Sequence, residues 1–310
     1  MRITNSMISR SMLMDLNNNL LRLSDIERQV TTGKRIAKLS DDPIGSITSI
    51  QLRSKLNRIS QYQENVQSAQ EYLQQVETNT NEMNSIIVSA YESAINLASD
   101  YNESDRAAVA EKIGQYRDHI LELGNASFLD TYMFGGYNTT TRPFSLDASG
   151  KILYNGVDMS NAADPDLLAE GGDTLKYEIG MGMRVEVGFT GVDFMGTGED
   201  NVYNLLNDLY NALKGDSSAE EISAYAGKLL DAQDRVLANL AEIGGRTNRL
   251  DLMEARYEQD TLNFKEMQSN NDDIDITEAI VNFYAARTVY SYALQVGAQT
   301  MDTSLINFLK

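Results

Sequence analysis

The last stretch of the chain, residues 275–310, carries apolar residues that recur every three or four positions. This spacing places them in one stripe along a helix and is typical of a helix that packs against another helix. About 34 helical residues at ~1.5 Å each form a rod on the order of 50 Å long, which is too narrow to bury the stripe alone. The stripe comprises Ile280, Tyr284, Leu294, Ala298, Met301, Leu305 and Phe308, with Arg287 and Ser291 in the same register.

A comparable stripe lies at the opposite end of the chain and is interrupted by Glu27. We therefore expect the two termini to lie side by side. Residues 1–60 carry ten Lys or Arg against five Asp or Glu, and residues 271–310 carry five acids against two bases, so their opposite charges favour this pairing. Exposed ion pairs are each worth little. The N-terminal stripe comprises Leu13, Leu16, Leu20, Leu23 and Val30.

Two thin helices bury little surface and leave their backs exposed. We therefore expect neighbouring subunits to complete the two terminal stripes, which makes their apolar residues a candidate assembly interface. The candidate interface residues are Leu13, Leu16, Leu20, Leu23, Val30, Ile280, Tyr284, Leu294, Met301, Leu305 and Phe308.

Composition limits the classes of function. A chain of 310 residues has room for two or three domains. The net charge of −19 argues against nucleic acid and anionic membrane as partners. The absence of cysteine excludes disulfides and thiolate sites. No stretch approaches the roughly 18 apolar residues of a membrane span. The first residues lack the apolar core of a secretory signal, so any export must use a route that does not read one.

Helix boundaries are marked by glycine, proline and capping residues. Gly33 suits the end of the first helix, and residues 40–42 offer capping oxygens for a helix whose first turn contains Pro43. A cation site at the two adjacent acids is the weaker alternative. Heptads over residues 44–100 predict one long helix or two nearly collinear ones, and a further helix follows Ser104.

Helical periodicity disappears in residues 141–198, which hold ten of the 21 glycines. Strict alternation over residues 175–189 predicts strands with one buried face, with a turn at residues 180–182. Ile152 and Tyr154 predict another strand, before a turn at residues 155–156. We expect a small β insertion that has a core of its own and folds independently.

Helix returns at residue 199. The sequence Ser-Ala-Glu-Glu at 218–221 has the spacing of a capping box and opens a second very long helix, which we expect to loosen at Gly244 and Gly245. The acidic run at residues 270–273 ends it, and residues 275–278 cap the terminal helix. A calcium loop at these acids is disfavoured because it lacks the required glycine and distal glutamate.

The predicted fold class is mainly α with a small β insertion. It consists of long antiparallel α-helical rods in a coiled-coil bundle, paired N- and C-terminal helices and an outer β domain. We predict a terminal helix-pair domain from residues 1–43 and 271–310. A helical-rod domain comprises 44–140 and 199–270, and the β-rich insertion domain comprises 141–198.

The sequence contains no phosphate loop, nucleophile elbow, metal-binding histidine pair or cysteine nucleophile. The single histidine, His119, is interpreted as structural. We expect no catalytic residues, no cofactor and no bound metal. An adhesin or enzyme with coiled-coil rods and a site in the β insertion is the alternative, although residues 141–198 offer few polar side chains for such a site.

Six short motifs, in this order and at these distances, make the chain resemble the flagellin family of bacterial axial proteins. Within that family, Pro43 and the short insertion favour the hook-associated proteins of the hook–filament junction over filament flagellin, which remains the alternative. The motifs are Met1-Arg2-Ile3-Thr4, Gly33-Lys34-Arg35-Ile36, Ser40-Asp41-Asp42-Pro43, Tyr132-Met133-Phe134-Gly135-Gly136, Ile243-Gly244-Gly245-Arg246-Thr247-Asn248-Arg249-Leu250 and Ile274-Asp275-Ile276-Thr277-Glu278-Ala279.

The resemblance implies an extracellular structural role in the bacterial flagellum. It implies that the protein is exported through the flagellar secretion channel with a dedicated export chaperone. It also implies a ring of identical subunits stacked between a hook-side junction protein and flagellin. None of these partners follows from the periodicity of the sequence.

Overall fold

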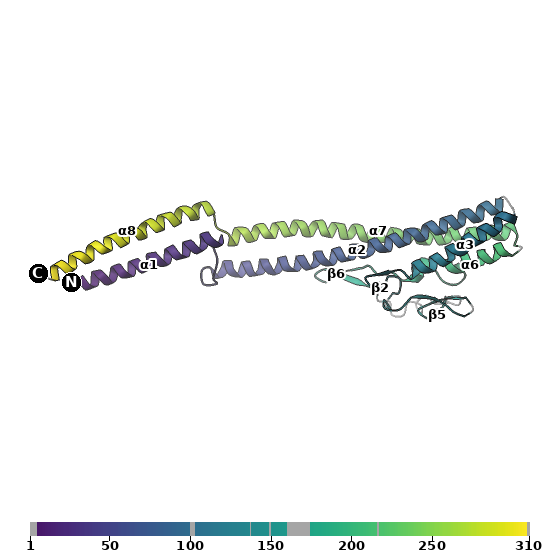
Figure 1. Ribbon diagram of the computed structural model, residues 1–310, viewed down its shortest axis with the longest axis horizontal. Coiled ribbons are helices and arrows are strands. Elements are labelled where there is room, and N and C mark those ends of the chain that lie inside the picture. The colour runs from purple at the N-terminus through teal and green to yellow at the C-terminus, as the bar shows by residue number, and fades with distance from the viewer. Residues whose placement is uncertain are drawn as a thin grey trace. The chain divides into compact units, whose positions relative to one another are not determined.

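The computed structural model describes residues 5–99, 103–136, 138–148, 150–159, 174–215 and 217–308. The motif at residues 1–4 lies outside this part of the chain. Long helices dominate the described residues, and the predicted fold class is confirmed (Figure 1). The long helices are α1 (Asn5–Thr32), α2 (Pro43–Ser99), α3 (Glu103–Gly124), α6 (Val202–Lys214), α7 (Ala219–Asp272) and α8 (Ile276–Phe308).

The chain divides into two compact units. The terminal unit comprises Met1–Ile59 and Gln259–Lys310, and the central unit comprises Ser60–Glu258. In the terminal unit, α1 and α8 run antiparallel and side by side (Figure 1). The predicted pairing of the terminal helices is confirmed. The same unit contains the first turns of α2 and the last turns of α7.

The helix ends follow their predicted signals. Gly33 adopts a left-handed φ of 69° just after α1, a conformation that glycine adopts readily. Ser218 and Glu221 form the predicted capping box, with N–H to oxygen distances of 3.2 and 3.3 Å. The Asp275 carboxylate accepts from the backbone N–H of Thr277 at 2.8 Å and caps α8. These contacts satisfy N–H groups that helices otherwise leave unpaired.

The predicted loosening of α7 at Gly244 and Gly245 is wrong, because α7 is one continuous helix from Ala219 to Asp272. Each glycine costs a helix about 1 kcal/mol relative to alanine. Ile243 and Leu250, on either side, are fully buried, so packing holds the helix through this point.

The predicted heptads of α2 form the core of the helical part. Their side chains are buried because bulky apolar groups recur on one face while polar residues occupy the others. The buried residues of this register are Leu52, Ile59, Val66, Ala69, Leu73, Val76, Thr80, Met83, Ile87, Ala90, Ala94 and Leu97. In the central unit, α3 packs on α6, and the buried Arg106 donates to the C-terminal carbonyls of α6 at Leu213 and Ala212.

The strands form three small antiparallel sheets. The pairs are β1 with β2, β3 with β4 and β5 in order, and β6 with β7. The turn at Asn155 and Gly156 and the hairpin at residues 180–182 lie at their predicted positions. The strands are β1 (Ser127–Phe128), β2 (Thr131–Tyr132), β3 (Phe144–Leu146), β4 (Ile152–Tyr154), β5 (Val157–Asp158), β6 (Lys176–Gly180) and β7 (Met183–Glu186). Two short helices follow, α5 (Gly191–Met195) and η2 (Gly198–Asp200).

The β insertion shares its core with the helices, so the prediction of an independent core is wrong. Phe144 packs against Gly124, the last residue of α3, and its ring centre lies 5.0 Å from that of Tyr154. The Tyr154 hydroxyl donates to the carbonyl of Phe134 at 2.9 Å, and burial raises the pKa of Tyr154 to about 12. Alternating strands this short cannot enclose a core, so their apolar faces pack on residues outside the insertion, among them Phe134.

Candidate functional site

The candidate site lies in the terminal unit, where α1 and α8 form an isolated helix pair. The partly buried residues of α1 recur at alternating steps of three and four, which marks the face toward its partner. This seam of α1 comprises Ser9, Met12, Leu16, Asn19, Leu23, Ile26 and Val30. Of the predicted residues, Leu16, Leu23 and Val30 lie in the seam, whereas Leu13 and Leu20 are exposed.

On α8 the observed seam lies one residue before the predicted stripe. Its members alternate between alanine and larger residues and end at a buried glycine: Ala279, Phe283, Ala286, Tyr290, Ala293 and Gly297. Gly297 lies against Met12 and Leu16 of α1. Small side chains let two helices approach closely, so the bulkier neighbouring stripe points outward. Ile280, Tyr284 and Leu294 are therefore exposed instead of packed against the N-terminal helix, and their role in an assembly interface stays a prediction.

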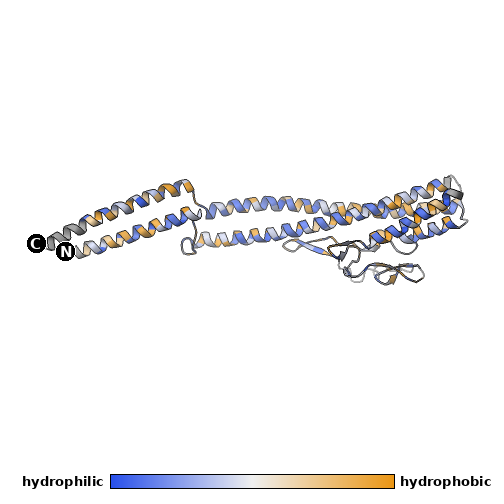
Figure 2. Ribbon diagram, viewed as in Figure 1, coloured by the Kyte–Doolittle hydropathy of each residue, from blue (hydrophilic) through white to orange (hydrophobic). Residues whose placement is uncertain are grey.

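Many large apolar side chains of both terminal helices are exposed. Figure 2 shows that hydrophobic residues recur along both helices. Leu13 is 56% exposed, Tyr284 59% and Leu294 46%. The exposed set is Met7, Leu13, Met14, Leu20, Leu21, Ile276, Ile280, Val281, Tyr284, Val289, Tyr292, Leu294 and Val296. Exposed apolar patches of this kind mark interaction surfaces. The side chains of Met301, Leu305 and Phe308 lie outside the described part of the structure.

The two linkers of the terminal unit are joined to each other. Residues 33–35 follow α1, residues 273–275 precede α8, and Lys34 and Asp273 form an antiparallel β-bridge. The N–H of Ile274 donates to the Gly33 carbonyl at 3.1 Å, and the N–H of Arg35 donates to the Asp272 carbonyl at 2.7 Å. The Lys34 ammonium also pairs with the Asp273 carboxylate. The bridge therefore fixes where α1 ends and α8 begins.

Asp272 is the buried centre of this connection, with only 2% of its side chain exposed. Its carboxylate accepts from the Ser49 hydroxyl at 2.7 Å, from the Asn271 amide at 2.7 Å and from Arg53 at 3.4 Å. Burial alone would raise the pKa of Asp272, but these hydrogen bonds favour the charged form and lower it below 3.8. The acidic run at the end of α7 therefore also holds α7 to α2, through the contacts of Asp272 with Ser49 and Arg53.

The loop between Arg35 and Pro43 is ordered by its two acids, which do different things. Asp42 caps α2 by accepting from the N–H of Gly45 at 2.9 Å, in agreement with the predicted capping role of residues 40–42. Asp41 folds the loop by accepting from the N–H groups of Ala37 and Lys38, at 3.3 and 2.9 Å. The Lys38 N–H is the main reason that the pKa of Asp41 lies below 3.8. The loop holds the side chain of Leu39 in solvent, 62% exposed.

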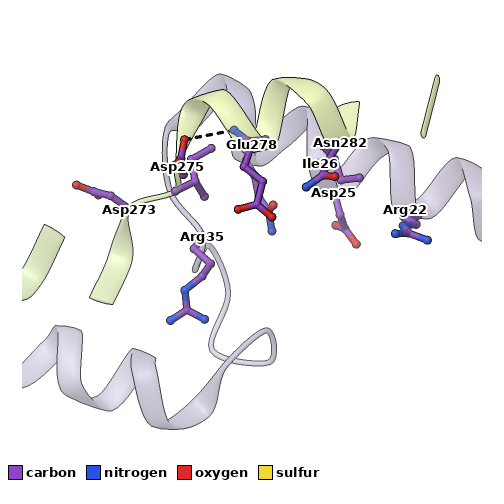
Figure 3. A pocket seen from close by; sticks show the side chains of 11 residues that line it. Arg22, Asp25, Ile26, Arg35, Asp273, Asp275, Glu278 and Asn282 are labelled. Carbon is purple, nitrogen blue, oxygen red and sulfur yellow. Dashed lines mark hydrogen bonds between the residues drawn. The ribbon is translucent and has the colours of Figure 1, made fainter. Parts of the chain in front are cut away.

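A cleft of about 630 Å³ lies between α1, α8 and the linkers (Figure 3). Ile26, Ile274 and Ala279 supply its apolar lining. Its charged lining consists of the carboxylates of Asp25, Asp273, Asp275 and Glu278 and the guanidinium groups of Arg22 and Arg35. The sequence offers no signal for this cleft, because it depends on how the two linkers cross.

Other chemistry is sparse in the described residues. No three His, Asp or Glu side chains among them are placed to hold a metal ion. None of the helices they form is both long and apolar enough to cross a membrane. His119 is 42% exposed and lies 2.8 Å from the Glu82 carboxylate, whose hydrogen bond raises the pKa of His119 above 6.5. This contact joins α3 to α2.

The sequence is similar to those of known flagellar proteins. Residues 3–139 match the family model described as the bacterial flagellin N-terminal helical region. Flagellar hook-associated protein 3 of Escherichia coli (strain K12) is 24% identical over 334 aligned positions, which cover 100% of both chains. The chain is similar to bacterial flagellins over its N-terminal region and to a flagellar hook-associated protein along its full length. Its resemblance to the flagellin family, and within it to the hook-associated proteins, is confirmed.

Solved structures of flagellar hook-associated and junction proteins share the fold. A protein of Vibrio parahaemolyticus, provisionally described as a flagellar hook-associated protein, aligns with a TM-score of 0.66 at 24% identity. The alignment covers 75% of this chain and 100% of that one. The flagellar junction protein FlgL of Legionella pneumophila aligns with a TM-score of 0.57 at 14% identity, covering 74% and 100% of the two chains. At these identities the structural likeness supports the fold alone.

Proposed function

We propose that this chain is a structural junction protein of the bacterial flagellum that joins the hook to the flagellin filament. The observation that carries the proposal is the similarity to flagellar hook-associated protein 3 along the full length of both chains. The paired terminal helices suit such a role, because their exposed apolar faces need further protein to cover them. The role is structural and includes no catalysis.

The assembly interface is the outward face of the α1/α8 pair. Leu13, Leu20, Ile280, Tyr284 and Leu294 supply exposed apolar surface there. In the proposed assembly, identical subunits form a ring through this face, between a hook-side junction protein and flagellin. Met301, Leu305 and Phe308 continue the stripe toward the C-terminus and belong to the same proposed interface.

The proposed route places the protein outside the cell, exported through the flagellar secretion channel without a cleaved signal peptide. A dedicated export chaperone would cover the apolar faces of the terminal helices before assembly. The three parts predicted from the sequence then have separate roles. Residues 1–43 with 271–310 assemble, residues 44–140 with 199–270 form the rod, and residues 141–198 face outward.

Deletion of the gene in its host tests the proposal. We expect assembled hooks without filaments, with flagellin released into the medium, because the filament would lack its attachment point. Restoring the gene should restore filaments. Hooks without filaments and without any flagellin in the medium would instead identify the chain as the filament flagellin. Filaments of normal length and number would contradict both assignments.

A further inference from the structure

The cleft of the terminal unit contains a carboxylate with no cationic partner among the described residues. Asp25 pairs with Arg28 at 3.1 Å, Asp273 pairs with Lys34, and Asp275 caps α8. The side chain of Glu278 forms no hydrogen bond or ion pair with another residue of the described ranges. Figure 3 shows this side chain projecting from the first turn of α8 among the residues that line the cleft.

The lining of the cleft combines this carboxylate with an apolar surface. Four carboxylates against two guanidinium groups give the lining an excess of negative charge. Ile26, Ile274 and Ala279 lie beside them. A fitting occupant therefore carries a cationic group next to an aliphatic one, so that it can place the first at Glu278 and the second against the isoleucines.

One segment of the same chain has this chemistry in adjacent residues. Lys38 is exposed and forms no ion pair within the part of the chain that the structure describes, and Leu39 beside it is 62% exposed. The loop that carries them is held by the Asp41 carboxylate, which also lies 3.5 Å from Arg28 of α1. A loop that is already ordered loses little conformational entropy when it binds.

Three other cations of the terminal unit are engaged elsewhere or belong to the cleft itself. Arg53 is engaged with Asp272, and Lys55 lies over the ring of Phe264 at 5.2 Å. Arg22 already lines the cleft. Lys38 combines an exposed charge with an adjacent apolar residue that is also exposed.

We propose that the cleft at Glu278 receives Lys38 and Leu39 of a second copy of this chain. The inference rests on the proposed function and names a contact within its ring. Loop and cleft are different surfaces of one unit, so each copy offers both halves of the contact. In such a head-to-tail contact, each pair of subunits still has an unused cleft on one copy and an unused loop on the other. The contact can therefore repeat around a ring of subunits or along a helical array of subunits. It does not close as a two-fold dimer.

Cross-linking in assembled flagella tests the contact directly, because the chain has no cysteine of its own. The full-length chain carrying both Lys38→Cys and Glu278→Cys is expressed in its host, and purified flagella are treated with a mild thiol oxidant. We expect a ladder of covalent multimers of the chain on non-reducing gels. The matched control, Lys265→Cys with Glu278→Cys, places the first thiol on an exposed position of α7 and should give no ladder.

Charge reversal provides a second measurement that needs no thiols. Lys38→Glu and Glu278→Lys should each lower the amount of chain in flagella by on the order of tenfold, because each puts two like charges together at the contact. The double variant should recover most of the loss. Lys265→Glu changes the charge equally and should leave incorporation unchanged.

Each outcome decides the inference. The inference would be overturned if the double-cysteine variant entered flagella normally but gave no ladder. It would also be overturned if the double charge-reversal variant were incorporated no better than the two single variants. Adducts formed only with another flagellar protein would overturn the second copy as the occupant. Absence of even the unmodified chain from flagella would contradict the proposed function, and this inference with it.

Discussion

The hydroxyl of Ser49 donates a 2.7 Å hydrogen bond to the buried carboxylate of Asp272, although 223 positions separate the two residues in the sequence. Ser49 lies in the second turn of α2, and Asp272 is the last residue of α7. The backbone carbonyl of Asp272 also accepts from the N–H of Arg35, and its carboxylate accepts from the side-chain amide of Asn271. Asp272 therefore connects both linkers to the long helices. It is thus a buried anchor of the terminal helix pair, beside the bridge between Lys34 and Asp273.

The first prediction concerns this anchor. Asp272→Ala leaves the Ser49 hydroxyl and the Arg53 guanidinium without their acceptor, which should destabilise the terminal unit by about 1–3 kcal/mol. Thermal melts by circular dichroism and the rate of limited proteolysis at residues 33–42 measure the loss. Asp273→Ala is the control and should cost less, because its carboxylate is 37% exposed. Equal effects of the two changes would show that burial of Asp272 does not matter.

The second prediction is an acid-sensitive terminal unit. The folded-state pKa values of Asp272 and Asp273 both lie below 3.8, for Asp273 chiefly because Lys34 donates to it. A depressed pKa gives stability that is present above the unfolded value and lost as pH falls through the folded one. Proteolytic protection of the linkers should therefore fall below about pH 4.

The double variant Asp272→Asn/Asp273→Asn tests the cause of this dependence. Its protection should be lower at pH 7 and should change less between pH 5 and pH 3. Asp41 and Asp42, whose pKa values are also lowered by backbone hydrogen bonds, remain in the variant and should preserve part of the dependence. An unchanged pH profile would assign the acid response to other carboxylates.

The sequence predicts the buried helices well where their polar and apolar faces differ. Val66 and Leu73 recur at heptad spacing among polar residues, so only one face can be buried. On α8 apolar residues occupy neighbouring faces, and two adjacent stripes both have heptad spacing. The stripe at Ile280 is the bulkier and gives the stronger signal, but a close helix pair selects the small side chains at Ala279 and Gly297.

Features that depend on distant partners are not predictable in the same way. The acids at residues 272–273 indicate a helix end correctly, yet nothing nearby in the sequence reveals the contact with Ser49. The aromatic residues between 128 and 137 are visible in the sequence, but the core that Phe144 shares with Gly124 depends on the folded positions of α3 and β3. Local patterns specify helices and turns, whereas these contacts are set by how the elements pack.

The third prediction separates two residues of β3. Phe144→Ala removes a fully buried ring that packs on Gly124 and Tyr154, and should destabilise the central unit by about 3–5 kcal/mol. Leu146→Ala, two residues along the same strand, changes a side chain that is 44% exposed and should cost roughly 0.5 kcal/mol or less. Urea unfolding followed by helical circular dichroism measures both. If Phe144→Ala left the unfolding transition of the helices unchanged, the insertion would have to fold independently of them.

The fourth prediction concerns the closest approach of the terminal helices. A Cβ at Gly297 would collide with the end of the flexible Met12 side chain. Gly297→Ala should be nearly neutral, because Met12 can move and alanine favours the helix by about 1 kcal/mol. Gly297→Leu should separate the helices at a cost of about 1–3 kcal/mol. Proteolysis of α1 reports the pairing, and equal protection in the two variants would show that no close approach exists there.

The last prediction distinguishes the inner seam of α8 from its outward face by two adjacent residues. Ala293 lies in the seam toward α1, whereas the neighbouring Leu294 is 46% exposed. Ala293→Asp should destabilise the helix pair by several kcal/mol, because it places an unpaired carboxylate between two apolar surfaces. Leu294→Asp should leave the isolated pair as stable as the parent, by proteolysis and circular dichroism. In the host it should be exported normally yet fail to enter flagella, since its carboxylate would be buried only on assembly. Normal motility with Leu294→Asp would mean that this outward face is not the assembly interface. A destabilised isolated pair would mean instead that Leu294 belongs to the seam.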